Sequence, residues 1–251
     1  MSIAVAPRPS FRMTALAGVA LASLMLSACS QSREMHTGSI GGSASGVEAL
    51  EKSYMRSPND PRRAIAYADA LKAAGNGERA KAVLERAVAA TPQDKTALSA
   101  YGRYLVETGN AQAGLAMLAK AEQAGAADWR IYSAQGAAYD MLGEHAEAQA
   151  QYAKARKIAL NEPAIASNLG LSLALSGKLK EAEALLRTAS ERSRDQRIRQ
   201  NLALVIGLQG RFEEAEKVAT ADLSAEDAAA NVAYMRQMLR QDDRWKKIKQ
   251  S

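Results

Sequence analysis

The sequence has few of the residues that stabilise sheets or small disulfide-bonded domains. Its 251 residues include one cysteine, two tryptophans, two phenylalanines and six prolines. A single cysteine excludes an intramolecular disulfide, and the low aromatic content argues against a sheet built from aromatic and β-branched side chains. Because alanine supplies much of the apolar fraction, the composition favours helices that pack at short distance.

Residue patterns typical of enzyme active sites are also missing. The sequence has no glycine-rich phosphate loop, no metal-ligand spacing and only two histidines, His36 and His145. His145 follows a turn glycine by two places, where we expect a packing side chain. We therefore expect no enzymatic activity, no cofactor and no metal. An unrecognised hydrolase site that includes His145 is the remaining enzymatic alternative.

The charge is not concentrated in one sign. The formal net charge is +6, from 33 Lys and Arg against 27 Asp and Glu residues. Proteins that bind nucleic acid concentrate basic residues on one surface, and a mixed charge of this size gives no reason to expect such a partner.

The N-terminus has the organisation of a secretory signal. Arg8 and Arg12 precede an apolar run, Ala15–Leu26, that is long enough for a signal peptide and too short to cross a bilayer. The run leads into the sequence LSAC, whose cysteine is Cys29 and which resembles the lipobox of bacterial lipoproteins. The resemblance implies removal of residues 1–28 and acylation of Cys29 with lipid that includes palmitate. An ordinary signal peptide with an incidental cysteine is the alternative.

Residues 29–45 are expected to form the lipidated cysteine and a flexible tether. The stretch SQSREMHTGSIGGSAS is rich in Ser and Gly and lacks apolar periodicity. Several acyl chains would anchor the protein stably, since each buried methylene contributes about 0.8 kcal/mol. Ser30 stands where lipoproteins of the inner membrane often carry Asp. The resemblance therefore implies an outer-membrane lipoprotein that faces the periplasm of a Gram-negative bacterium.

From residue 47 onward the sequence repeats with a period of 34 residues. Glycines recur at this spacing at Gly75, Gly109, Gly143 and Gly177. Two further positions keep their size, one small (Ala80, Gly114, Ala148, Ala182) and one large (Leu84, Leu118, Tyr152, Leu186). Such a period is typical of stacked helical hairpins. We expect four full repeats at about 61–94, 95–128, 129–162 and 163–196, and a fifth whose glycine, Gly210, comes one residue early.

These positions resemble the tetratricopeptide repeat over about residues 47–222. In that family small residues hold the eighth, twentieth and twenty-seventh places and glycine the fifteenth. The usual early Trp is absent, and Pro holds the thirty-second place only as Pro58 and Pro92. The resemblance implies an all-α solenoid of antiparallel helix pairs wound into a right-handed superhelix. An irregular alanine-rich bundle is the alternative.

Both ends of the solenoid, predicted at residues 46–222, are atypical. A helix at Val47–Ser57 is in phase with the second half of a repeat, which would cover the open apolar face of the first repeat. Ser224 predicts the start of a capping helix within 223–240, with Tyr234 among its apolar residues. Residues 241–251 contain several Lys and Arg residues around Trp245. They are predicted to form a basic tail, either solvated or in contact with a partner or an anionic surface.

The family resemblance also implies a binding groove. In tetratricopeptide solenoids the first helix of each pair lines the concave side. The matching positions predict a peptide-binding groove formed by Arg103, Arg130, Ser133, Ala137, Ser167, Asn168, Leu171, Arg197, Asn201 and Leu204. Asn168 and Asn201 hold the same place in successive repeats, where an amide can donate to and accept from a peptide backbone. A structural asparagine, common at that place, is the alternative.

The chain as a whole resembles the TadD lipoproteins of the tight-adherence (Flp) pilus apparatus. The resemblance includes the acylation signal, the tether, the repeats and the C-terminal sequence AEDAAANVAYMRQMLRQDDRWKKIK. It implies a non-enzymatic, pilotin-like adaptor whose partners are the secretin or other pilus-assembly components. A periplasmic scaffold for other cell-envelope or peptidoglycan machinery is the alternative.

Overall fold

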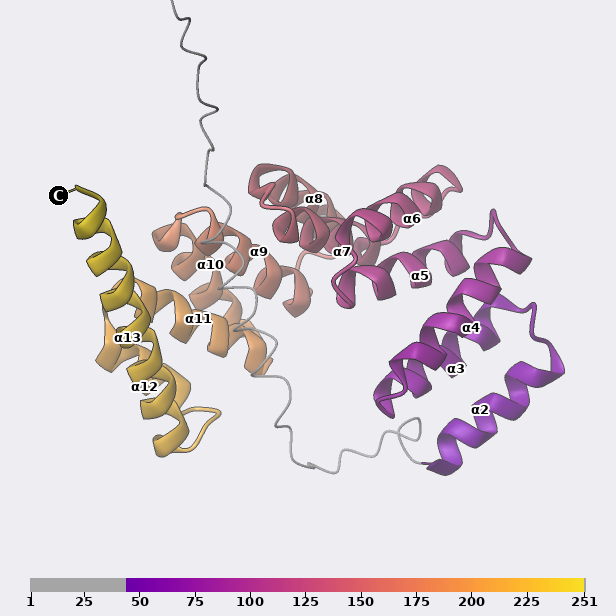
Figure 1. Cartoon of the computed structure of the whole chain (residues 1–251), viewed down its shortest axis with the longest axis horizontal. Helices are drawn as coiled ribbons and strands as arrows, with labels where there is room; N and C mark the ends of the chain where they lie inside the picture. The colour runs from indigo at the N-terminus through magenta and orange to yellow at the C-terminus, as the bar shows by residue number, and fades with distance from the viewer. Residues whose placement is uncertain (1–43, 251) are drawn as a thin grey trace, which may run out of the picture. The chain divides into compact units, whose positions relative to one another are not determined.

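The computed structural model describes the backbone of residues 44–250 and the side chains of residues 45–240. This part of the chain contains twelve helices and no strand (Figure 1). The helices are α2 (Ala44–Arg56), α3 (Pro61–Ala73), α4 (Gly77–Ala90), α5 (Lys95–Glu107), α6 (Ala111–Gln123), α7 (Trp129–Met141), α8 (His145–Ile158), α9 (Pro163–Leu175), α10 (Leu179–Arg192), α11 (Gln196–Leu208), α12 (Phe212–Ala219) and α13 (Ala225–Gln250).

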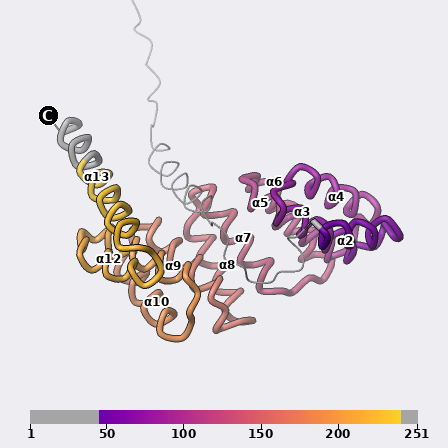
Figure 2. The backbone as a smooth tube through the Cα atoms, turned by 90° about the horizontal axis from the view of Figure 1, so that it is seen from below, coloured from indigo at the N-terminus to yellow at the C-terminus, as the bar shows by residue number. Residues whose placement is uncertain are grey.

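Helices α3 to α12 form five consecutive pairs, each with a first and a second helix. Each first helix packs against its own second helix, and each second helix packs against the first helix of the next pair. The first helices α3, α5, α7, α9 and α11 also contact one another in sequence. They therefore form a continuous layer, called here the first-helix layer, and the succession of pairs can be followed in Figure 2. The predicted helix pairs and their spacing are confirmed.

Aspartates and glycines fix where the helices begin and end. Asp60, Asp94, Asp128 and Asp195 each cap a first helix by accepting a hydrogen bond from a backbone N–H of its first turn. The predicted turn glycines, such as Gly143 with a φ of +79°, all lie in the left-handed region. Most L-residues are strained there, so glycine allows the short turn that folds the second helix back on the first.

The two helices of a pair approach closely where the repeat keeps a small residue. A Cβ atom added to Gly136 would lie 2.7 Å from the Tyr152 ring, and one added to Gly170 would lie 2.6 Å from Leu186. Tyr152 and Leu186 are fully buried. The large position predicted from the period, held here by Tyr152 and Leu186, thus packs in the core against the glycine at the eighth place of the same repeat.

The first and last helices are longer than predicted. Helix α2 begins at Ala44, so the last two residues of the predicted tether, Ala44 and Ser45, are helical instead of flexible. Helix α13 runs to Gln250, whereas the sequence predicted a helix to residue 240 followed by a basic tail. No glycine or proline interrupts residues 241–250, and basic residues near a helix C-terminus are favourable with the helix dipole.

The capping helix begins as predicted. The Ser224 hydroxyl accepts from the backbone N–H of Asp227 at 3.1 Å, and Ala228, Val232 and Met235 are buried against the last pair. Tyr234 was wrongly placed on the apolar face, because its side chain is 49% exposed. The signal segment 1–28, Cys29 and the tether up to residue 43 lie outside the described residues.

Candidate peptide-binding face

The ten predicted groove residues all lie on the first-helix layer. Helix α5 carries Arg103, α7 carries Arg130, Ser133 and Ala137, α9 carries Ser167, Asn168 and Leu171, and α11 carries Arg197, Asn201 and Leu204. Because α5, α7, α9 and α11 contact one another in this order, the structure brings these residues onto one layer.

Asparagine side chains join successive repeats across this layer. The Asn168 amide donates to the Ser133 hydroxyl at 3.2 Å, and the Asn201 amide donates to the Ser167 hydroxyl at 2.9 Å and to its carbonyl oxygen at 3.2 Å. Ser133 and Ser167 are buried, whereas both asparagines are half-buried. Neither asparagine Oδ1 atom accepts a hydrogen bond from a described residue, so the α7–α9 and α9–α11 boundaries each retain an amide acceptor.

The three arginines of the predicted groove differ in their hydrogen-bond and ion-pair partners. Arg197 makes two hydrogen bonds to Asp195, at 2.6 and 3.1 Å, and Arg130 lies 3.4 Å from Asp128 with its guanidinium 4.6 Å from the centre of the Trp129 ring. Both carboxylates are the caps of the helices that carry the arginines. Arg103 is half-buried and has no hydrogen bond or ion pair with any described residue.

The apolar side chains of the predicted groove are partly exposed to solvent. Ala137, Leu171 and Leu204 are half-buried, and the first and third of these also pack against the core. Apolar side chains that are neither buried nor fully exposed can still lose solvent-accessible area on contact with a partner, which is favourable by about 25 cal/mol per Å².

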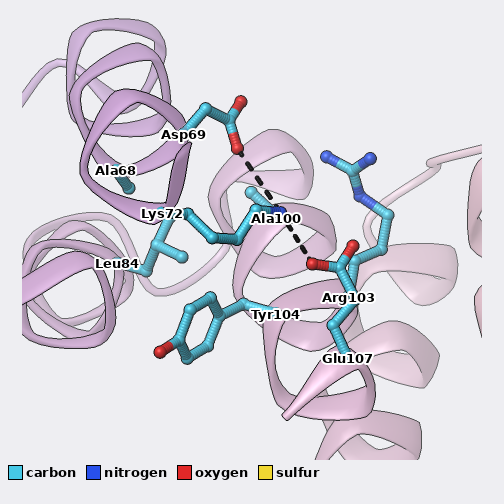
Figure 3. A pocket seen from close by; sticks show the side chains of 8 residues that line it. All are labelled: Ala68, Asp69, Lys72, Leu84, Ala100, Arg103, Tyr104 and Glu107. Carbon is cyan, nitrogen blue, oxygen red and sulfur yellow. Dashed lines mark hydrogen bonds and ion pairs between the residues drawn. The ribbon is translucent and has the colours of Figure 1, made fainter. Parts of the chain in front are cut away.

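A small polar pocket lies between α3, α4 and α5 (Figure 3). Its volume is about 60 Å³. The lining residues are Ala68, Asp69, Lys72, Leu84, Ala100, Arg103, Tyr104 and Glu107. Lys72 Nζ lies 2.6 Å from a Glu107 oxygen and 4.0 Å from an Asp69 oxygen, so it connects the two carboxylates across the pocket.

A buried polar cluster that the sequence did not reveal joins α7, α8 and α9. Asp140 accepts hydrogen bonds from Ser172 at 2.8 Å and from Tyr152 at 3.1 Å, and it lies 2.9 Å from His145 Nδ1. Burial raises the pKa of Asp140 and outweighs the three hydrogen bonds, which lower it. His145 therefore belongs to this cluster and is not only a packing residue. Asp140, with 10% of its side chain exposed, takes part in repeat stacking.

A second charged cluster joins α10 to α12. Glu183 accepts hydrogen bonds from Arg187 at 2.9 Å, from Arg211 at 2.7 and 2.9 Å and from Gln209 at 2.7 Å. Glu214 binds the same two arginines. Burial raises the pKa of Glu183, but these donors together lower it to about 2. The arrangement neutralises charge between repeats.

Among residues 45–240, whose side chains the structure describes, no His, Cys, Asp and Glu side chains gather in a group of three or more that could hold a metal ion. In the same part of the chain no helix combines the length and the apolar character needed to cross a membrane.

Fold and repeat pattern together define an all-α tetratricopeptide-repeat solenoid, and the chain is a tetratricopeptide-repeat protein. Family models of the tetratricopeptide repeat match residues 44–104 and 163–188. These ranges cover α2 to α4, most of α5 and most of the α9–α10 pair. A comparison with curated proteins gave no match. Repeats of this kind serve as scaffolds for protein–protein interaction.

Several solved structures are similar in fold. TTC0263, a thermophilic TPR protein of Thermus thermophilus, is 22% identical with a TM-score of 0.62, over 70% of this chain and 99% of that chain. YrrB, described as a TPR protein with an unusual peptide-binding site, is 20% identical with a TM-score of 0.51, over 78% of this chain and 99% of that one. PilW, described as a widely conserved type IV pilus biogenesis factor, is 14% identical with a TM-score of 0.67, over 75% and 89%.

Proposed function

We propose that the protein is a non-enzymatic adaptor that binds a peptide segment of a partner protein on its first-helix layer. The observation that carries this proposal is the pair of asparagines at equivalent places on α9 and α11. Each is oriented by a serine of the preceding repeat, at 3.2 Å for Asn168 and 2.9 Å for Asn201. A side chain held in one orientation loses little conformational entropy when it binds, so the two Oδ1 atoms are suited to accept backbone N–H groups of an extended segment.

Replacing both asparagines tests the peptide site. We expect Asn168→Ala with Asn201→Ala to weaken binding about 10- to 100-fold, because each lost hydrogen bond contributes about 1 kcal/mol. Binding is measured by calorimetry against overlapping peptides that tile the secretin and pilus components of the same bacterium. Asn110→Ala, which changes an exposed asparagine at the start of α6, is the matched control. Unchanged affinity in the double variant, with an unchanged circular dichroism spectrum, would contradict the site.

The proposed location is the periplasmic face of the outer membrane, with acylated Cys29 as the anchor. Support comes from the lipobox-like sequence LSAC and from the basic start and apolar run that precede it. Labelling cells with a palmitate analogue should mark the wild-type protein and leave Cys29→Ser unmarked. Incorporation of label into the serine variant would exclude this acylation site.

The assembly that the adaptor serves is proposed to be the Flp pilus secretion apparatus, in a pilotin-like role that aids localisation or assembly of the secretin. The resemblance to TadD lipoproteins supports this proposal, and the similarity in fold to PilW is compatible with it. Deleting the gene should reduce secretin multimers in the outer membrane and reduce piliation. Normal multimers and normal piliation would exclude the role, and co-purification with peptidoglycan synthases would indicate the alternative envelope scaffold.

A further inference from the structure

The ninth place of each repeat changes character along the first-helix layer. Its occupants are Asp69 on α3, Arg103 on α5, Ala137 on α7, Leu171 on α9 and Leu204 on α11. Charged side chains therefore occupy this place in the first two repeats and apolar ones in the last three. A peptide that lies along the layer would meet a charged part and an apolar part.

Arg103 is the one groove arginine without a carboxylate partner among the described residues. Arg130 and Arg197 are held by the aspartates that cap their own helices. Arg103 lies in the middle of α5, far in sequence from the capping residue Asp94, and Figure 3 draws its guanidinium with no ion pair. The guanidinium of Arg103 therefore keeps its hydrogen-bond donors free of any partner among the described residues, and a carboxylate of a ligand can accept from two of them at once.

The pocket beside Arg103 has the size and the charge balance that a carboxylate requires. Lys72 connects Glu107 and Asp69, at 2.6 and 4.0 Å, which reduces the repulsion that these acids would exert on an incoming anion. The lining is otherwise small or apolar, and the Tyr104 hydroxyl already donates to the Gly77 carbonyl oxygen at 2.7 Å. A volume of about 60 Å³ accommodates a carboxylate group, and a bulky ring would not fit.

We propose that the pocket between α3 and α5 is a specificity site that binds an Asp or Glu side chain of the partner segment through Arg103. This inference rests on the proposed peptide-binding function and adds a chemical requirement to it. The segment would carry an acidic residue near the N-terminal repeats and apolar residues near Leu171 and Leu204.

Selection from a random peptide library tests the requirement. The library is displayed without a free C-terminus, so an enriched acid must be a side chain. The full-length wild-type chain is expected to enrich Asp or Glu at one position. Arg103→Gln should lose that enrichment and bind the wild-type peptides about tenfold more weakly, because a charge-assisted hydrogen bond is lost. Arg103→Glu should enrich Lys or Arg instead.

Two further variants control for folding and for general charge effects. Arg86→Gln removes an exposed arginine of α4 that has no ion pair among the described residues, and it should select the same peptides as the wild type. Arg103→Lys keeps the charge and should keep part of the acid preference. Two results would overturn the specificity site without contradicting the proposed function. In one, the wild type selects peptides that share no Asp or Glu; in the other, Arg103→Gln keeps the acid preference of the wild type. Failure of the wild type to select any peptide would count against the proposed function itself.

Discussion

At Gly170 the backbone of α9 lies directly against the Leu186 side chain of α10. An alanine Cβ there would be 2.6 Å from two Leu186 carbons, closer than any normal contact. We expect Gly170→Ala to lower the free energy of unfolding by about 1–3 kcal/mol, because the core must shift to admit the methyl group. Urea denaturation followed by circular dichroism measures the change.

A variant at a second glycine distinguishes the effect of steric crowding from the effect of backbone conformation. Gly143 has nothing within 4 Å of an added Cβ and a φ of +79°. Asparagine tolerates that region, so Gly143→Asn should change stability much less than Gly170→Ala. Equal losses at the two positions would show that the Leu186 contact is not the cause.

The sequence predicted which residues lie on the first-helix layer but not which of them are available. Arg103, Arg130 and Arg197 looked equivalent because each sits at a groove position of its repeat. Two of them are neutralised by an aspartate two residues earlier, and that pairing depends on side-chain rotamers that a repeat pattern does not specify. The hydrogen bonds from Asn168 to Ser133 and from Asn201 to Ser167 were not predicted for the same reason, because they too depend on side-chain rotamers.

Between helices, the charged cluster around Glu183 links α10 to the start of α12. The folded-state pKa of Glu183, about 2, lies below the ordinary value of 4.5. The cluster therefore stabilises the fold above pH 4.5, and this stabilisation is lost as pH falls from about 4.5 to about 2. The pKa of Glu214 is also lowered, by hydrogen bonds from Arg187 and Arg211, so the second acid acts in the same direction.

Glu183→Gln should remove much of this pH dependence. At about pH 7 we expect the variant to be about 1–2 kcal/mol less stable, a modest value because the arginines are partly exposed. The difference from the wild type should shrink as the pH falls towards the folded-state pKa of about 2. Urea unfolding at several pH values measures it, and Glu181→Gln, at an exposed acid on the same helix, is the control. A difference that stays constant with pH would contradict the assignment.

Helix positions followed from sequence more closely than helix ends did. Capping by Ser224 was predicted because a hydroxyl before an apolar face is a local signal. The sequence does not predict the ends at Ala44 and Gln250, because a Ser- and Gly-rich stretch and a run of charged residues are each typical of non-helical chain. Such stretches can still be helical when they contain no proline and extend a helix that has already formed, because adding residues to an existing helix costs less than starting a new one.

For the whole molecule, stability should follow the number of neighbours of each helix. Helix α2 packs mainly on α3, whereas α7 packs on α5, α6, α8 and α9. In solenoids each repeat is stabilised by its own folding and by its interfaces, so the end helix opens first. Hydrogen–deuterium exchange should show α2 amides exchanging at least about 30-fold faster than those of α7, a difference of about 2 kcal/mol. Equal protection throughout would indicate a single cooperative unit.

Each helix pair packs mainly against the neighbouring pairs, and this affects how the solenoid responds to a mechanical load. If one end of the chain is held at a membrane and the other is pulled by a partner, the load passes through the interfaces between successive repeats one after another. Each repeat that opens would release about 110–120 Å of extended chain from its 34 residues. The solenoid would then lengthen in steps and refold when the load falls, acting as an extensible spring between its two attachment points.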